Sequence, residues 1–124
     1  MSRKWLKRAH YDENKVVDDF WKKGYPALRL PISGAGRFKS DVLAFTPHCI
    51  KLVLIRRSES EEKIVFEERE IKDVMSLAGK ISELTFPVGV EVVYHVHFPK
   101  QRKWKSGTLS YGRWKGGNVE VREE

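Results

Sequence analysis

Three charged residues stand at positions where the surrounding pattern is apolar, and these side chains are the first candidates for chemistry. Glu13 lies four residues before Val17 and seven before Phe20, so a helix would place all three side chains on one inward face. A buried carboxylate must cap a helix, form an ion pair or take part in a reaction, because burying it without a partner is costly. Asp41 and Arg56 flank a predicted hairpin and add an acid and a permanent positive charge.

Two histidines and one cysteine are further candidates. His95 and His97 alternate along a predicted strand and share one face, a spacing that some metal sites use. Since the sequence shows no third ligand, a surface or interface position is favoured for both histidines. Cys49 is the single cysteine, which excludes an internal disulfide and is typical of a reducing compartment. No catalytic partner for the Cys49 thiol is evident.

The elements that must position these residues follow from the periodicity. A helix is predicted over residues 12–23, with apolar residues at helical spacing and Gly24 as its C-cap. The segment YPALRLP is extended, and the basic loop SGAGRFKS leads from it to Asp41. This loop matches neither a dinucleotide fingerprint nor a phosphate-binding P-loop, because the required helix opening and the Gly-Lys-Ser/Thr run are missing.

The segments DVLAF and IKLVLIRR, separated by the turn TPHC, predict a β-hairpin. A turn centred between Pro47 and His48 sets Asp41 directly across from Leu54. We therefore expect Asp41, Leu54 and Arg56 to cluster at one place on the sheet. Because strand side chains alternate, one face of the second strand carries Leu52, Leu54 and Arg56, and the other face carries Val53, Ile55 and Arg57.

The remaining segments complete an α/β pattern. A strand (IVF) precedes a helix predicted over residues 67–81, and VGVEVVYHVHF is a central strand. The tail, TLSYGRW followed by a Lys-Gly-Gly-Asn turn and VEVRE, predicts an additional C-terminal β-hairpin. The expected architecture is one domain, residues 1–124, with a mixed β-sheet flanked by helices.

Composition limits the class of protein and its partners. The chain of 124 residues carries 24 Lys and Arg against 17 Asp and Glu, which gives a net charge of +7 and favours a polyanionic partner. No apolar run reaches the ~18 residues that span a bilayer, and the basic N-terminus lacks the apolar region of a secretory signal. We therefore expect a cytoplasmic protein that does not bind membranes.

The segment DENKVVDDFWKKGYPALRLPISG, together with the aspartate that opens the hairpin, resembles the archaeal Holliday junction resolvases. The resemblance runs from roughly Tyr11 to Ile81. It implies the PD-(D/E)XK nuclease fold, that is, a restriction-endonuclease-like mixed sheet flanked by helices. In that family the order is a helix Glu, a Ser-Gly loop, an Asp at a strand start and a Glu-x-Lys at the end of the next strand.

Residue by residue, the resemblance assigns the helix carboxylate to Glu13, the loop hydroxyl to Ser33 and the strand aspartate to Asp41. The family's glutamate and lysine positions fall on Leu54 and Arg56, so this chain departs from the family at the centre of the motif.

That departure affects the chemistry directly. The resemblance implies Mg²⁺ held by Asp41 and the family's glutamate, with the lysine positioning or activating water. Leu54 cannot coordinate a metal, and Arg56, whose pKa lies above ~12, cannot act as a base. We therefore interpret Glu13, Asp41 and Arg56 as a remnant catalytic site, with at most weak metal binding at Asp41 and no cofactor unless some Mg²⁺-dependent activity remains. Arg56 is then expected to form an ion pair with Asp41 or Glu13.

One alternative restores the missing ligand. Some nucleases of this fold carry the glutamate on the following helix, and here the segment FEERE supplies Glu67, Glu68 and Glu70. The competing interpretation is that these are ordinary acidic residues at a helix N-terminus, where the macrodipole favours them.

Basic residues are the candidates for DNA contact. In the family, the N-terminal segment and the Ser-Gly loop approach the DNA backbone. Trp104, Tyr111 and Trp114 lie among further basic residues and would either stack on bases or pack in a core or dimer interface. The contact candidates are Arg3, Lys4, Lys7 and Arg8 in the N-terminal arm and Ser33, Arg37 and Lys39 in the loop.

Three functional hypotheses follow. The first is a catalytically inactive or impaired resolvase-like protein that binds branched or double-stranded DNA, including four-way junctions, as a homodimer, alongside a recombination or repair partner. The apolar and aromatic residues of the later strands would suit the dimer interface. The second is an active Mg²⁺-dependent, structure-specific endonuclease with a relocated carboxylate. The third is a protein–protein interaction module on an inherited nuclease fold.

Overall fold

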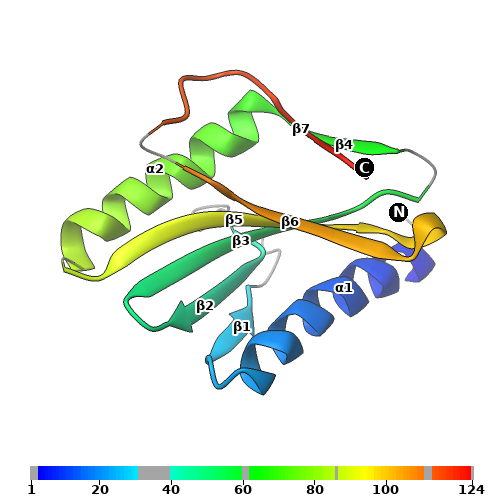
Figure 1. Cartoon of the computed structure of the whole chain (residues 1–124), viewed down its shortest axis with the longest axis horizontal. Helices are drawn as coiled ribbons and strands as arrows, with labels where there is room; N and C mark the ends of the chain where they lie inside the picture. Colours follow the sequence, from blue (N-terminus) through cyan, green and yellow to red (C-terminus); the bar gives the residue numbers. More distant parts are fainter. Residues whose placement is uncertain (1–2, 31–39, 60–61, 86, 111–112, 124) are drawn as a thin grey trace.

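The chain folds into a curved sheet with one long helix on each side (Figure 1). The computed structural model describes residues 3–30, 40–59, 62–85, 87–110 and 113–123, and for residues 3–9 it describes the backbone only. The elements in chain order are α1 (Arg3–Lys22), β1 (Ala27–Arg29), β2 (Val42–Thr46), β3 (Cys49–Arg57), β4 (Lys63–Phe66), α2 (Glu68–Thr85), β5 (Gly89–Phe98), the 3₁₀ turn η1 (Pro99–Gln101), β6 (Lys103–Leu109) and β7 (Val119–Arg122).

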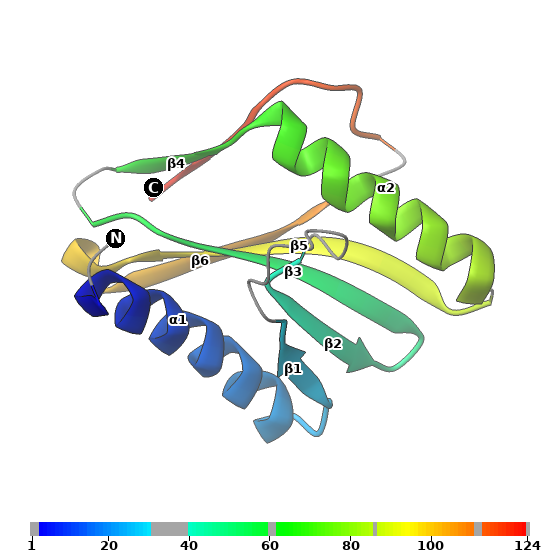
Figure 2. The same cartoon turned by 180° about the vertical axis from the view of Figure 1, so that it is seen from behind.

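The main sheet has five strands in the order β1-β2-β3-β5-β6. Strands β3 and β5 are parallel and the other neighbours are antiparallel, so the sheet is mixed, as expected from the sequence. The connection between the parallel pair passes through β4 and α2, which lie on the face opposite α1 (Figures 1 and 2). A second sheet contains only β4 and β7. The fold class predicted from the sequence is confirmed.

Two apolar cores form, one on each face of the sheet. On the α2 face, Leu52 and Leu54 join the apolar stripe of α2 around the fully buried Phe66 and Phe98. On the α1 face, the smaller core is formed chiefly by these buried residues: Val16, Ala27, Val42, Ala44, Val53, Ile55 and Val93.

Helix α1 begins much earlier than the sequence pattern predicted. The expected start was Asp12, whereas the helix starts at Arg3, so the N-terminal arm is helical. The reason is local, because Lys, Arg, Leu and Ala in this stretch are strong helix formers even without an apolar stripe. The end agrees better with the prediction: Gly24 has φ +87°, and its N–H donates to the Trp21 carbonyl at 2.9 Å.

The β2–β3 hairpin has the predicted register. Val42 lies opposite Val53, so the residue before Val42 lies opposite the residue after Val53, as expected for Asp41 and Leu54. His48 closes the turn with φ +66°. The alternation is also confirmed, since Leu52 and Leu54 pack in the α2-side core while Val53 and Ile55 pack in the α1-side core.

Helix α2 carries the predicted stripe. The sequence predicted a helix over residues 67–81, and the helix spans Glu68–Thr85. At its C-terminus, the Thr85 hydroxyl donates to the Ile81 carbonyl at 2.8 Å. The buried residues of the stripe are Ile71, Val74, Met75 and Ala78.

The two C-terminal strands are present, but they do not pair with each other as the predicted hairpin required. Strand β6 is antiparallel to β5, and β7 pairs with β4 in the second sheet. The physical reason is tertiary: the edge of β5 takes up β6, and Val121 of β7 is buried beside Phe66 in the α2-side core. Gly116 and Gly117, both with positive φ, form the turn that redirects the chain.

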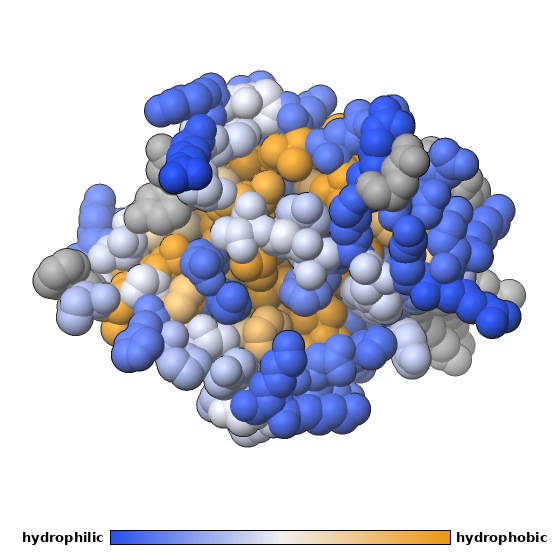
Figure 3. Space-filling model, in the orientation of Figure 1, coloured by the Kyte–Doolittle hydropathy of each residue, from blue (hydrophilic) through white to orange (hydrophobic). Residues whose placement is uncertain are grey.

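The surface is mixed. Figure 3 shows hydrophilic residues around much of one face and hydrophobic residues gathered in its central part. The later strands were expected to supply exposed apolar side chains, but the large hydrophobic residues that are exposed in the described part of the chain lie mostly earlier. Among the described residues, no helix is both long and apolar enough to cross a membrane. The exposed residues are Tyr11, Trp21, Leu28, Phe45, Val65, Leu84 and Val88.

Candidate functional site

The basic end of β3 meets the beginning of β2 at a charged cluster. The Asp41 carboxylate accepts two hydrogen bonds on Oδ2, one from the Ile55 N–H at 2.8 Å and one from Nη1 of Arg56 at 3.0 Å. Nη1 of Arg56 also donates to the Ile55 carbonyl at 2.7 Å, and the guanidinium lies 5.5 Å from the centre of the Phe66 ring. The guanidinium is therefore held in place from several sides, and the expected ion pair between Arg56 and Asp41 is confirmed.

A second carboxylate reaches the same guanidinium from α2. Nη2 of Arg56 forms an ion pair with Oε1 of Glu70. Of the three glutamates considered for a relocated carboxylate, Glu70 is the one that the described contacts bring to Arg56. The neighbouring Glu68 lies in the same first turn of α2, and its N–H donates to the Asn118 side chain at 2.7 Å. Arg56 thus bridges Asp41 and Glu70.

The position between these charges is apolar. Leu54, to which the sequence resemblance assigned the family's glutamate position, is 3% exposed and packs in the α2-side core. Its side chain supplies no oxygen to the cluster. Leu54 therefore contributes to the α2-side core and cannot act as a metal ligand.

Glu13 enters the cluster from α1. Its carboxylate lies on the buried face of the helix, as predicted, and its Oε1 is 3.9 Å from Nη1 of Arg29. Within the described residues this oxygen has no hydrogen-bond partner. Burial and the nearby Asp41 charge raise the pKa of Glu13 to about 7, against the opposing charges of Arg29 and Arg56. Glu13 is therefore a poorly compensated acid that exchanges its proton near neutral pH.

The neighbouring residue on α1 forms a different cluster that sequence reasoning missed. Asp12 is 1% exposed, and its Oδ1 lies 3.1 Å from Nη1 of Arg57 and 3.0 Å from Nδ1 of His97. Burial raises the pKa of Asp12, while His97 and Arg57 oppose that rise. The His97 ring stacks on Trp104 with ring centres 4.5 Å apart. One sequence signal for this cluster was available. The alternation of side chains along β3 placed Arg57 on the same face as Val53 and Ile55, which is the α1 face.

His95 is separate from this cluster. It lies on the same face of β5 as His97, as predicted, but its ring packs edge-on against Phe20 at 6.2 Å between ring centres. Burial lowers the pKa of His95. The two histidines therefore have different partners.

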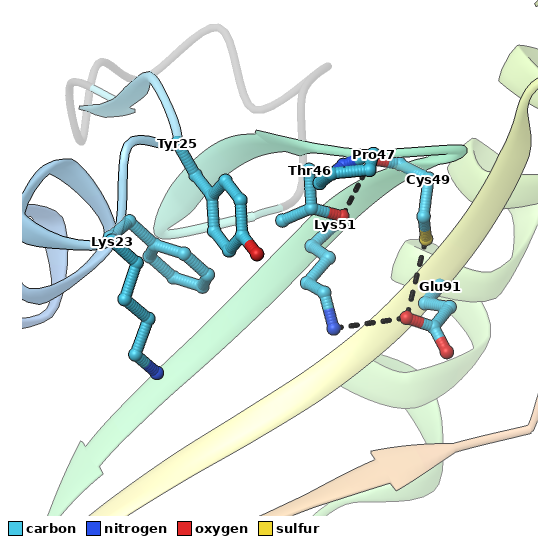
Figure 4. Close-up of a pocket in the computed structure, with 8 residues that line it drawn as sticks. Lys23, Tyr25, Thr46, Pro47, Cys49, Lys51 and Glu91 are labelled. Atoms are coloured by element: carbon cyan, nitrogen blue, oxygen red, sulfur yellow. Dashed lines mark hydrogen bonds and ion pairs between the residues drawn. The ribbon is translucent and has the colours of Figure 1, made fainter.

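Cys49 lies at the other end of β3, on the wall of an open cavity of about 400 Å³ (Figure 4). Its thiol donates to Oε1 of Glu91 at 3.2 Å, and Lys51 pairs with the same oxygen at 3.0 Å. Burial and the Glu91 carboxylate raise the pKa of Cys49 to about 11, so the thiol stays protonated at neutral pH and is a poor nucleophile.

The DNA-contact candidates are only partly covered by the described residues. Arg3, Lys4, Lys7 and Arg8 lie on the first two turns of α1, where the backbone is described. Ser33, Arg37, Lys39 and Tyr111 lie outside the described residues. Base stacking is not favoured for the two tryptophans, because Trp104 packs against the α1-side core and Trp114 against the α2-side core.

The cluster does not fit a metal of the kind that the family resemblance implies. Across the described ranges, no group of three or more His, Cys, Asp or Glu side chains is arranged to hold a metal ion. Asp41 is engaged by Arg56, and Leu54, the residue to which the resemblance assigns the family's glutamate, is buried and has no side-chain oxygen. The guanidinium thus places a permanent positive charge between Asp41 and Glu70.

The mixed sheet, the helix on each face and the charged cluster at the β2–β3 end define a nuclease-type α/β fold. The chain belongs to the archaeal Holliday junction resolvase family: the family model described as "Archaeal holliday junction resolvase (hjc)" matches residues 6–98. It is also similar in structure to Archaeoglobus fulgidus Hjc, described as a Holliday junction resolvase from an archaeal hyperthermophile, with a TM-score of 0.69 and 16% identity over 92% of this chain and 88% of that chain. Fourteen chains of solved structure match in total. No curated protein matches in sequence.

Proposed function

We propose that this chain binds branched or double-stranded DNA, including four-way junctions, as a homodimer and does not cleave it by the metal-dependent chemistry of its family. The observation that carries this proposal is the Arg56 guanidinium, which pairs with Asp41 at 3.0 Å and also with Glu70. The Arg56 guanidinium neutralises the Asp41 carboxylate, and Asp41 is the residue to which the family resemblance assigns metal binding.

The chemistry of the individual residues supports the loss of cleavage. Metal-assisted phosphodiester hydrolysis needs a metal held by several oxygen ligands and a positioned water. Leu54 is buried and offers no oxygen. Arg56 cannot take a proton from water, because its pKa stays above ~12. With Oδ2 of Asp41 already bound to two donors, no described side chain takes over these tasks.

The DNA-binding part rests on family membership and on charge. A net charge of +7 on 124 residues attracts phosphates. Because binding releases counterions from the DNA, the affinity depends on the salt concentration. A gel-shift series with a labelled four-way junction and its component duplex, run in EDTA at increasing salt, tests this part. We expect binding at ~50 mM salt, and the logarithm of the binding constant should fall linearly with the logarithm of the salt concentration. Absence of binding, or binding without a salt slope, would contradict it.

Dimerisation is supported by the sheet edge. Strand β6 ends the five-stranded sheet and crosses the face on which Figure 3 shows hydrophobic residues gathered in the centre. A second copy that pairs along β6 would protect this edge strand. Light scattering after size exclusion should give twice the 14.5 kDa of one chain. A monomer mass at every concentration would overturn this part.

The contact between Arg56 and Glu70 favours one second candidate, an active endonuclease in which Glu70 has replaced the missing glutamate. In that case Arg56 would have to move aside before the carboxylates could act. Incubating the labelled junction with Mg²⁺ or Mn²⁺ separates the two candidates. Cleavage that disappears in both Asp41→Ala and Glu70→Gln variants would establish the second candidate and reject the first.

A further inference from the structure

The connection between β5 and β6 carries a dense run of positive charge. Residues 99–105 read PKQRKWK, with four basic residues and no acidic one. Lys100, Arg102 and Lys103 are exposed. We call these three residues the basic turn. The Ser-Gly loop and N-terminal segment were the expected DNA contacts, and the basic turn belongs to neither.

The backbone of the basic turn is tightly specified. Pro99–Gln101 form the 3₁₀ turn η1, and Arg102 follows it with φ +53°. This left-handed conformation is uncommon for residues other than glycine, asparagine or aspartate. The Arg102 N–H donates to the Pro99 carbonyl at 3.1 Å, which closes the turn. The chain thus holds an arginine at a position where a glycine or asparagine would fit with less strain.

Strand register places the basic turn close to the C-terminal end of β3. Arg57 lies opposite His97 in the β3–β5 pair, and the turn starts two residues further along β5. At about 3.3 Å per residue, its tip lies roughly 10 Å beyond the end of β3. That distance is smaller than the major-groove width of about 12 Å, so one duplex can contact both the basic turn and the end of β3.

A second basic segment lies next to the turn. Figures 1 and 2 both show the β5–β6 connection beside the beginning of α1. The first two turns of that helix carry four basic residues, at positions 3, 4, 7 and 8. Segments about ninety residues apart in sequence therefore bring positive charge to one end of the molecule.

The basic turn is available for a partner. Lys103 pairs with Glu123 at 3.4 Å, and both side chains are partly exposed, so the pair contributes little and is readily exchanged. For Lys100 and Arg102, the described residues include no ion-pair partner. We infer that the basic turn binds the phosphate backbone of the duplex arm that lies against the β3 end of the molecule. This inference rests on the proposed DNA binding and adds a specific contact surface to it.

The test compares two charge-neutralising double variants of the full chain. Lys100→Gln with Arg102→Asn removes two charges from the turn, and asparagine keeps the left-handed backbone accessible. Lys22→Gln with Lys80→Gln removes two exposed charges from helix positions far from the turn. Circular dichroism and thermal melting of both variants verify that each is folded. Binding of a fluorescent duplex and a four-way junction is then measured by anisotropy at several salt concentrations.

We expect the turn variant to lose affinity by roughly tenfold or more near 100 mM salt, with the log–log salt slope reduced by about two. The control variant should keep a slope closer to that of the wild type. A turn variant that behaves like the control overturns this inference and leaves the proposed DNA binding intact. A wild-type chain that binds neither DNA overturns both.

Discussion

The Asp41 carboxylate and the Arg56 guanidinium are joined by a hydrogen bond of 3.0 Å across the β2–β3 hairpin. Asp41 lies before the first strand of the hairpin and Arg56 near the end of the second, so the register of the strands brings them together. Glu70 binds the same guanidinium from α2. Arg56 thus connects the start of β2 with the first turn of α2.

Removing this ion pair should cost a measurable but limited amount of stability. Asp41 and Arg56 are partly exposed, so we expect a coupling energy of about 1 kcal/mol rather than that of a fully buried pair. The measurement is a double-mutant cycle with Asp41→Asn and Arg56→Gln in urea. Lys15→Gln with Asp19→Asn, an exposed pair on α1, serves as a control with a smaller coupling. A coupling near zero for Asp41 and Arg56 would show that the contact is not energetically significant.

Glu13 should make stability depend on pH. Its pKa is raised from 4.5 to about 7 in the folded chain, so folding favours the protonated acid. The associated stabilisation is complete below pH ~4.5 and is lost as the pH rises through ~7, which amounts to about 3 kcal/mol at most. Glu13→Gln should therefore be more stable than the wild type at pH 8 and flatten the profile.

Urea midpoints between pH 5 and pH 8 give this profile. Burial also raises the pKa of Asp12, and Glu13→Gln leaves that contribution in place, so the contribution of Glu13 is the difference between the two profiles. Asp19→Asn, an exposed substitution on the same helix, should not alter the profile. Identical pH profiles for the wild type and Glu13→Gln would contradict the raised pKa of Glu13.

Asp12 should be important for the docking of α1 on the sheet. Asp12→Asn keeps the shape of the side chain but leaves Arg57 and His97 without their shared anion in a buried setting. We expect a loss of about 1 to 3 kcal/mol in the free energy of unfolding, because Arg57 keeps its ion pair with Glu59 and the burial of Asp12 already opposes its charged form. Asp18→Asn on the same helix should change it by less than about 0.5 kcal/mol. An Asp12→Asn chain as stable as the wild type would mean that the cluster makes no net contribution.

Much of the fold was predictable because its signals are local. The alternation of side chains and the Thr-Pro-His-Cys turn sufficed for the β2–β3 register, and from it the contact between Asp41 and Arg56. The stripe of α2 and the long β5 strand were recognised in the same way.

Other features depend on contacts between distant segments. Asp12 and His97 are separated by 85 positions, and nothing in either local pattern indicates that they meet. The pairing of β7 with β4 is decided by burial in the α2-side core, and this competition between possible strand partners is not visible in the turn residues. The early start of α1 reflects helix propensity without amphipathic periodicity.

The central claim is that Arg56 occupies the role of a bound cation, and a Mn²⁺ titration tests it most directly. Isothermal titration calorimetry of the wild type should show no saturable binding, because the guanidinium already pairs with Asp41 and Glu70. Arg56→Ala leaves these carboxylates without a counter-charge and should show binding that Asp41→Asn, added to it, removes. Saturable Mn²⁺ binding by the wild type that is lost in Asp41→Asn would contradict the claim.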